Sequence, residues 1–129
     1  MLMKNIGFIT TNKIFAQSFA STIKIQKYLD FHPFLLLNPK QASLDIVIMK
    51  IDIAVVDIVE IASKNLATLS AFCEELQAAK PDIRILLLAS QDDHVDRRLA
   101  MDAVRDGKAD DFVYYDTSLD YLFAKLGAM

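Results

Sequence analysis

Five short apolar segments alternate with amphipathic segments along the whole chain. The apolar segments cover residues 6–10, 33–37, 53–56, 83–88 and 112–115, and their lengths suit β-strands. Between them, apolar residues recur every three or four positions, as in Phe15, Phe19 and Ile23, which is typical of a helix that covers one face of a sheet. Such an alternation with short connections predicts a parallel sheet with right-handed crossovers. We therefore expect a three-layer α/β fold.

Local signals mark where several of these helices begin and end. The first helix is expected over residues 12–27. Asn38 followed by Pro39 predicts a helix N-terminus, because asparagine caps the free amides and proline suits the first helical position. Pro81 ends the helix before the fourth strand, and Gly107 lies where a helix C-cap belongs.

Length and composition indicate one domain over residues 1–129. Hydrophobic residues make up 53% of the chain, above the usual share of about 45–50%, which suits a doubly covered sheet and leaves apolar surface for a partner. Cys73 is the only cysteine, so no internal disulfide forms, and a cytoplasmic location is expected. No apolar run approaches the roughly 20 residues of a membrane span, and no secretory signal is visible. A net charge of −3 and a pI near 5.2 argue against direct binding of nucleic acid.

Asp57 is the residue that most directly suggests a function. The Ile- and Val-rich run of residues 51–56 is typical of a strand buried on both faces, which places Asp57 at the carboxyl end of a central strand. Open α/β sheets bind their ligands at this edge. Two interpretations stay open. Asp57 either serves ligand sensing or interaction, or it is a structural carboxylate that hydrogen-bonds Thr10, Thr11 or a loop amide.

Sequence patterns for catalysis or cofactor binding are missing. The chain has only three glycines, which cannot build a phosphate-binding loop, and it has no nucleophile elbow around a serine. His32 and His94 lie far apart, and only Cys73 could join them, so no metal-ligand spacing exists. Cys73 itself lies on the apolar face of a helix and is expected to be buried and inert. We expect no enzymatic turnover, no bound cofactor and no metal.

The order of these features resembles that of a response-regulator receiver domain. The resemblance rests on the alternation, on Asp57 after the third strand, and on residues 81–88 and 107–112, which read PDIRILLL and GKADDF; it covers essentially the whole chain. It implies a flavodoxin-like (βα)5 fold with sheet order 2-1-3-4-5. It also implies phosphorylation of Asp57 by a histidine-kinase partner, with Mg²⁺ required.

Several positions depart from the receiver pattern. Thr10 and Thr11 stand where the family has the acidic pair that holds Mg²⁺. Ala89 replaces its Thr or Ser, and Tyr115 replaces its Lys. Two hydroxyls are poor substitutes for two carboxylates as ligands of a hard dication, and a tyrosine brings no positive charge to a phosphoryl group. We therefore expect phosphotransfer to Asp57 to be slow or absent, as in a degenerate pseudo-receiver.

Other acidic residues offer an alternative metal arrangement. Asp92 and Asp93 follow the fourth strand and belong to the same edge as Asp57, and Glu60 lies three residues beyond Asp57. The structural alternative is that the aspartates cap the following helix and that Glu60 is a solvated loop residue. The acids at 110–111 precede the fifth strand, so they belong to the opposite edge and are interpreted as a turn feature.

The resemblance also assigns switch positions to Ala89, Phe112 and Tyr115. In the family, the strand-five aromatic turns inward when the strand-four Thr or Ser moves toward the phosphoryl group. Because Ala89 leaves that space open permanently, we hypothesise that Phe112 rests inward and locks one surface state. The alternative is that Phe112 is ordinary strand packing.

The family's signalling face, built from the fourth helix, the fifth strand and the fifth helix, carries candidate contact residues. These are Arg97, Arg98, Tyr114 and Tyr121. By helical phase, Asp96 and Lys125 also belong to this face. Mixed charges of this kind suit a symmetric homodimer, or they are an ordinary solvated helix face.

We interpret the chain as a receiver-like signal-transduction domain of a two-component or transcription-regulatory system. It is expected to bind a protein partner, a histidine kinase or a regulatory protein, without phosphorylation. One alternative is a working receiver phosphorylated on Asp57 through Mg²⁺ and an atypical set of ligands. A second is a small-molecule sensor that uses the edge around Thr10, Asp57, Ala89 and Tyr115. Any binding of DNA would belong to an output domain after Met129.

Overall fold

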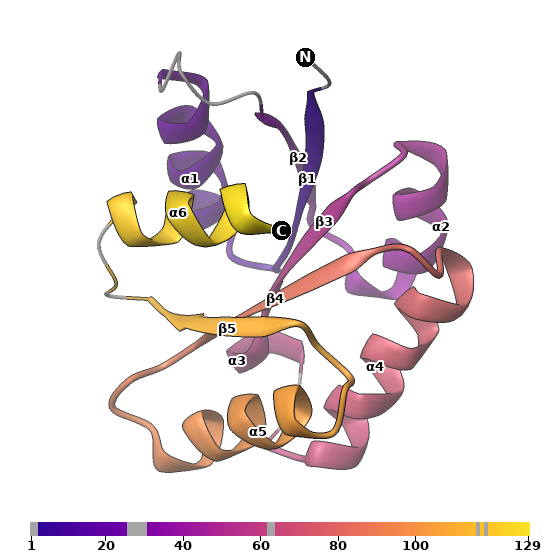
Figure 1. Cartoon of the computed structure of the whole chain (residues 1–129), viewed down its shortest axis with the longest axis vertical. Helices are drawn as coiled ribbons and strands as arrows, with labels where there is room; N and C mark the ends of the chain where they lie inside the picture. The colour runs from indigo at the N-terminus through magenta and orange to yellow at the C-terminus, as the bar shows by residue number, and fades with distance from the viewer. Residues whose placement is uncertain (1–2, 26–30, 62–63, 116, 118) are drawn as a thin grey trace.

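In the computed structural model, five parallel strands form one twisted sheet with helices on both faces (Figure 1). The structure describes residues 3–25, 31–61, 64–115, 117 and 119–129. The elements are β1 (Lys4–Ile9), α1 (Lys13–Ile25), β2 (Phe31–Leu36), the 3₁₀ turn η1 (Pro39–Gln41), α2 (Ala42–Ile48), β3 (Ile53–Asp57), α3 (Ile58–Ile61), α4 (Leu66–Ala79), β4 (Arg84–Ala89), α5 (His94–Arg105), β5 (Asp111–Tyr114) and α6 (Leu119–Ala128). The sheet order β2-β1-β3-β4-β5 confirms the prediction of a flavodoxin-like fold.

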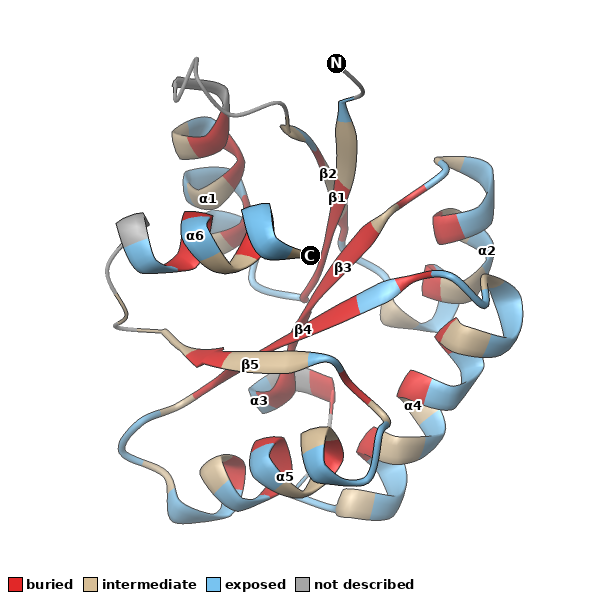
Figure 2. Cartoon of the chain, in the orientation of Figure 1, coloured by how far each residue is buried: buried red, intermediate tan, exposed pale blue. Residues whose placement is uncertain are grey.

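Two separate cores hold the helices onto the sheet. Helices α1 and α6 cover one face, while α2, α3, α4 and α5 cover the other (Figure 1). All five residues of β3 are buried, and its side chains alternate between the two cores. This explains why the strand has an unbroken apolar run, because neither face meets water. Figure 2 shows the buried residues concentrated in the central strands and on the sheet-facing sides of the helices.

The edge strand β2 pairs only with β1. An edge position explains how Pro33 is accommodated inside a strand, since proline cannot donate a ladder hydrogen bond. Gly7 on β1 is required for close packing beside it. A Cβ atom at Gly7 would lie 3.1 Å from Leu36 Cδ1 and 3.2 Å from Ile51 Cγ2. The glycine therefore lets two buried side chains approach the backbone of β1.

The predicted helix signals are confirmed where the structure describes them. The Asn38 side chain accepts a hydrogen bond from the Lys40 amide at 3.2 Å, and Pro39 is the first residue of η1. Gly107 has φ of +75° after α5. The first strand begins at Lys4, two residues before its predicted start. The predicted end of the first helix, residue 27, lies outside the described residues.

One prediction about the segment after Asp57 is wrong. The segment was expected to be a loop, but α3 begins directly at Ile58. Ile58 and Ile61 are both buried, at 0% and 9% exposure, and their three-residue spacing places them on one side of a helical turn against the core. Burial of these two isoleucines explains the helix. The side chain of Glu60 lies outside the described part of the chain.

Cys73 is buried on α4, as predicted. Its burial raises the pKa of the thiol to about 12, so very little thiolate exists at neutral pH. In the described part of the chain, no helix is both long and apolar enough to cross a lipid bilayer.

Candidate functional site

The carboxyl edge of the sheet brings together most of the residues singled out in the sequence. Asp57 ends β3, Ala89 ends β4, and Thr10 and Tyr115 directly follow β1 and β5. Because these four strands are neighbours and parallel, their ends meet at one edge. The Tyr115 amide donates to the Ala89 carbonyl at 3.1 Å, which continues the pairing of β4 with β5 to this edge.

Asp57 is held by Thr10 inside the protein. The Thr10 hydroxyl donates to Asp57 Oδ2 at 2.8 Å, and the two residues are only 2% and 4% exposed. The same hydroxyl accepts from the Asn12 amide at 3.0 Å, close to the start of α1. Thr10 thus links the carboxylate to the first helix. The structural interpretation of Asp57 expected a bond from Thr10, Thr11 or a loop amide, and Thr10 provides one.

An aromatic row occupies the place where the receiver pattern has a lysine. The Tyr115 ring meets Phe15 of α1 edge-on, with ring centroids 5.4 Å apart. Phe15 then contacts Phe19 at 5.5 Å, and Phe19 contacts Phe8 of β1 at 5.1 Å. Each such pair contributes about 0.5–1.5 kcal/mol beyond burial of its area. Tyr115 is therefore part of the packing between β5 and α1 and brings no cation to the edge.

The groups at this edge do not fit Mg²⁺. The ion takes near-octahedral oxygen ligands that include carboxylates, whereas Asp57 is joined here by a hydroxyl that already donates one hydrogen bond and accepts another. Among the described residues, no three His, Cys, Asp or Glu side chains are grouped so that they could hold a metal. Asp93 accepts from the amides of Val95 at 2.9 Å and Asp96 at 3.1 Å, so it caps α5.

A lysine missed in the sequence connects two loops at the carboxyl edge. Lys64, whose backbone φ is +58°, forms ion pairs with Asp93 and, at 3.1 Å, with Asp96. Hydrogen bonding to Lys64 lowers the pKa of the Asp93 carboxyl, and the same bond raises the pKa of Lys64. The ion pairs therefore fasten the segment before α4 to the first turn of α5.

The position of Asp96 corrects the predicted signalling face. Asp96 was assigned to an exposed helix face, but it is 2% exposed. Leu99, Ala100 and Ala103 are buried at positions three, four and seven residues beyond it. Asp96 thus belongs to the buried stripe of α5, and this spacing was a signal in the sequence. Its charge is balanced by Lys64, so it is unavailable to a partner.

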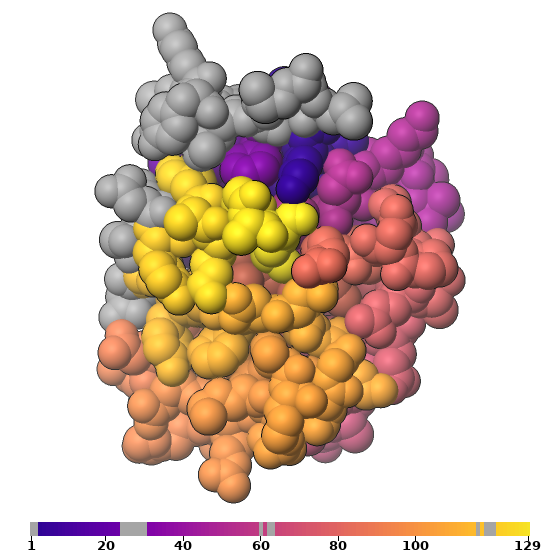
Figure 3. All heavy atoms as spheres, viewed as in Figure 1, coloured from indigo at the N-terminus to yellow at the C-terminus, as the bar shows by residue number. Residues whose placement is uncertain are grey.

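The predicted contact residues on α5, β5 and α6 differ in their exposure. These three elements form one continuous surface on the face seen in Figure 3. Arg98 is exposed and Tyr121 is 49% exposed, whereas Arg97 is half-buried and contacts the His94 ring. Tyr114 is half-buried and packs edge-on against Phe112, with ring centroids 5.6 Å apart.

The charge of Lys125 is also less available to a partner than its helical phase suggested. Its ammonium forms an ion pair with Asp111 at 2.5 Å and lies 5.4 Å from the centre of the Tyr121 ring. Asp111 and its neighbour Asp110 lie at the opposite edge of the sheet, as predicted. Asp110 accepts from the Ile85 amide at 2.8 Å and so fixes the turn into β5.

Phe112 lies half-buried against the core under α5. In the pairing of β4 with β5 it stands opposite Leu87, and Tyr114 stands opposite Ala89. Phe112 packs against the core cluster that contains Ala89. It therefore does not point into solvent, while its role as a switch residue stays a prediction.

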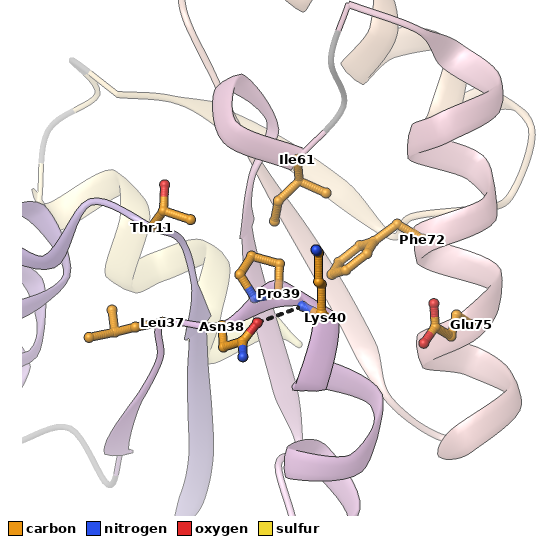
Figure 4. Close-up of a pocket in the computed structure, with 8 residues that line it drawn as sticks. All are labelled: Thr11, Leu37, Asn38, Pro39, Lys40, Ile61, Phe72 and Glu75. Carbon is orange, nitrogen blue, oxygen red and sulfur yellow. Dashed lines mark hydrogen bonds between the residues drawn. The ribbon is translucent and has the colours of Figure 1, made fainter.

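A pocket of about 670 Å³ opens on the β2 side of the same edge (Figure 4). It is lined by Thr11, Leu37, Asn38, Pro39, Lys40, Ile61, Phe72 and Glu75. The sensor interpretation expected a pocket around Thr10, Asp57, Ala89 and Tyr115. Of the edge positions considered in the sequence, only Thr11 lines this pocket, because aromatic packing fills the side near Tyr115.

Comparison with known proteins shows which flavodoxin-like proteins share this fold. No family model matches the sequence, and no curated protein shows significant similarity to it. Solved receiver domains, in contrast, match almost the whole chain. The N-terminal domain of the nisin resistance regulator NsrR, a lantibiotic response regulator, has a TM-score of 0.76 at 20% identity, with 98% of this chain and 97% of that chain covered.

Two further structures give the same result. A response-regulator receiver domain from Clostridium thermocellum has a TM-score of 0.78 at 13% identity, covering 98% of this chain and 93% of that one. A response regulator from Thermotoga maritima has a TM-score of 0.74 at 19% identity, covering 98% and 97%. The chain has the fold of response-regulator receiver domains, which confirms the resemblance found in its sequence.

Proposed function

We propose that this domain is a receiver-like signalling module that binds a protein partner without phosphorylation of Asp57 and without enzymatic turnover. The observation that carries the proposal is the hydrogen bond from Thr10 to Asp57, together with the aromatic packing of Tyr115. The edge keeps the carboxylate of a receiver, but the positions that carry the receiver's first acid and its lysine hold a hydroxyl and a packed aromatic ring, neither of which is charged.

Electrostatics support this proposal. A phosphoryl group on Asp57 would bring a charge of about −1.5 to −2 to a residue that is 4% exposed. A buried charge of this size needs cations or several hydrogen-bond donors nearby. Thr10 offers one donor, and Tyr115 offers no charge. Lys64, a cation that the sequence did not anticipate, already pairs with Asp93 and Asp96.

The surface of α5, β5 and α6 is the proposed site for the partner. It combines exposed apolar side chains with a positive charge that forms no ion pair with the acidic residues described in the structure. Val95, Met101 and Tyr121 are 46%, 55% and 49% exposed, and Arg98 is exposed beside them. Tyrosine, methionine and arginine are the residue types enriched at protein interfaces. A regulatory protein, a histidine kinase or a second copy of the chain would bind here.

An NMR titration tests the proposal. Amide spectra of the protein are recorded with Mg²⁺ up to 10 mM and then with beryllofluoride, a mimic of aspartyl phosphate. We expect no shifts that cluster at Asp57, Ala89 and Phe112. A variant that restores the receiver residues, Thr10→Asp with Thr11→Asp and Tyr115→Lys, should gain Mg²⁺-dependent shifts and serves as the positive comparison.

The opposite result has a definite meaning. If the unaltered protein shows such shifts, and Asp57→Asn abolishes them, the domain is a working phosphoacceptor and the proposal is wrong.

The partner surface is tested separately. Arg98→Glu with Tyr121→Ala should abolish self-association or capture of a cognate kinase, whereas Lys50→Glu, at an exposed position beyond α2 and outside this surface, should not.

A further inference from the structure

The pocket of Figure 4 lies at the point of the sheet where α/β proteins bind ligands. Its walls come from residues that follow the carboxyl ends of three strands: Thr11 after β1, Leu37 to Lys40 after β2, and Ile61 after β3. In a sheet of order 2-1-3-4-5, the connections leave β1 and β3 toward opposite faces, so a crevice opens there. Its volume of about 670 Å³ is within the range of about 300–1,000 Å³ that is usual for small-molecule sites.

The lining is apolar on several sides and has one positive group. Leu37, Pro39, Ile61 and Phe72 supply the apolar walls. Figure 4 shows the Lys40 side chain extending between Pro39 and the Phe72 ring, with its amine end directed toward Ile61. A flat apolar group that lies against Pro39 and Ile61 would therefore be within reach of the Lys40 ammonium.

The lining also contains one carboxylate, Glu75, which forms no ion pair with Lys40. The Asn38 side chain accepts from the Lys40 backbone amide at 3.2 Å, which fixes the turn that carries the lysine. Glu75 accepts from the Ser43 hydroxyl at 2.9 Å. The ion pairs formed between described residues do not include Lys40. Its charge is available to an anionic ligand.

We propose that this pocket binds a small carboxylic acid with an aromatic or other flat apolar body. The carboxylate would pair with Lys40, and the apolar body would lie against Pro39 and Ile61. Such a ligand would connect the turn after β2 with α3 and α4, and α3 follows Asp57 directly. The inference depends on the pocket alone, so it stands or falls independently of whether Asp57 is phosphorylated.

The test uses 2-naphthylacetate as probe and its neutral primary amide as a matched control. Titration of the full chain at pH 7, followed by amide NMR, should give saturable shifts at residues 37–40, 61 and 72 with the carboxylate. The amide should bind about fivefold more weakly, the value expected for one solvent-exposed ion pair. Lys40→Met should reduce carboxylate affinity by about the same factor, while Lys50→Met, an exposed lysine beyond α2, should leave it unchanged.

Three results would overturn the proposal. They are equal affinity for the acid and its amide, an affinity that Lys40→Met leaves unaltered, and the absence of saturable shifts at 10 mM probe. Because Lys40 is exposed, its replacement should not unfold the domain, and unchanged shifts in the rest of the spectrum verify this.

Discussion

Replacing Thr10 by valine tests whether the bond between Thr10 and Asp57 holds the carboxyl edge together. Valine has nearly the same shape as threonine, so the change removes a hydroxyl without leaving a cavity. It deprives a buried carboxyl oxygen of a donor at 2.8 Å, which costs about 1–3 kcal/mol. It also removes the acceptor of the Asn12 amide just before α1, a hydrogen bond worth about 1 kcal/mol. We expect a total loss of about 2–4 kcal/mol.

Urea unfolding measures this loss. With a denaturant slope of about 2 kcal/mol per M, the unfolding midpoint of Thr10→Val should fall by about 1–2 M. Thr10→Ser is the matched control, because it keeps the hydroxyl and loses a single methyl group, a change of about 0.8 kcal/mol. A double-mutant cycle with Asp57→Ala then separates the two hydrogen bonds, since the part of the loss that arises from Asp57 disappears in that background.

The reasoning would be refuted by either of two results. One is a Thr10→Val midpoint that matches Thr10→Ser. The other is an equal loss in the presence and absence of the Asp57 carboxyl, which would show that the hydrogen bond observed at 2.8 Å contributes nothing to stability.

Three further predictions concern stability and reactivity. Gly107→Ala should destabilise the domain by about 1 kcal/mol and Gly107→Asn by less, both in urea unfolding, because φ is +75° and no atom lies close enough to clash, so only backbone strain acts. Cys73 should react with a thiol reagent at pH 8 about a thousandfold more slowly than the same cysteine in the unfolded chain. The reason is that a pKa of about 12 instead of 9.0 reduces the thiolate fraction by about that factor. A rapid reaction would contradict the burial of Cys73. The ion pairs of Lys64 should stabilise the folded protein only within a limited range of pH. Because the pKa of Asp93 is lowered, its ion pair adds stability above pH 3.8, and this stability is lost as the pH falls through the pKa of Asp93 in the folded protein. Because the pKa of Lys64 is raised, its ion pairs add stability below pH 10.5, and this stability is lost as the pH rises through the pKa of Lys64 in the folded protein. Urea midpoints measured from pH 2 to pH 12 should fall at both ends, and Lys64→Met should reduce both changes; an unaltered profile in that variant would disprove the assignment.

Features governed by neighbouring residues could be predicted from the sequence. The apolar run before Asp57 indicated a strand covered on both faces, and every residue of β3 is buried. The pair Asn38-Pro39 indicated a cap, and Gly107 indicated a turn with positive φ. These signals are local, because a cap or a left-handed residue is decided within a few positions of the chain. The order of the strands followed from the resemblance to receiver domains.

Contacts between distant segments were beyond the reach of such signals. Lys64 pairs with Asp96 across 32 positions of the sequence, and the aromatic row joins Phe15 to Tyr115 across a whole domain. The sequence showed that Tyr115 is not a lysine, but not that it would pack against α1. Asp96 was predicted on the exposed face although its spacing to Leu99 and Ala103 fits the buried stripe of α5, and its balancing charge comes from another loop.

The sequence by itself determined the five strands and the main helices, though not the short helix α3, and it showed that one carboxylate stands at the end of a central strand. Only the tertiary structure decided the chemistry around that carboxylate. Thr10 and Asp57 are 47 positions apart and meet because β1 and β3 are neighbours in the sheet. The pocket likewise exists only because the turns after β1, β2 and β3 leave the sheet at adjacent points. Local propensity fixes the elements, whereas packing of distant segments fixes which side chains share a site.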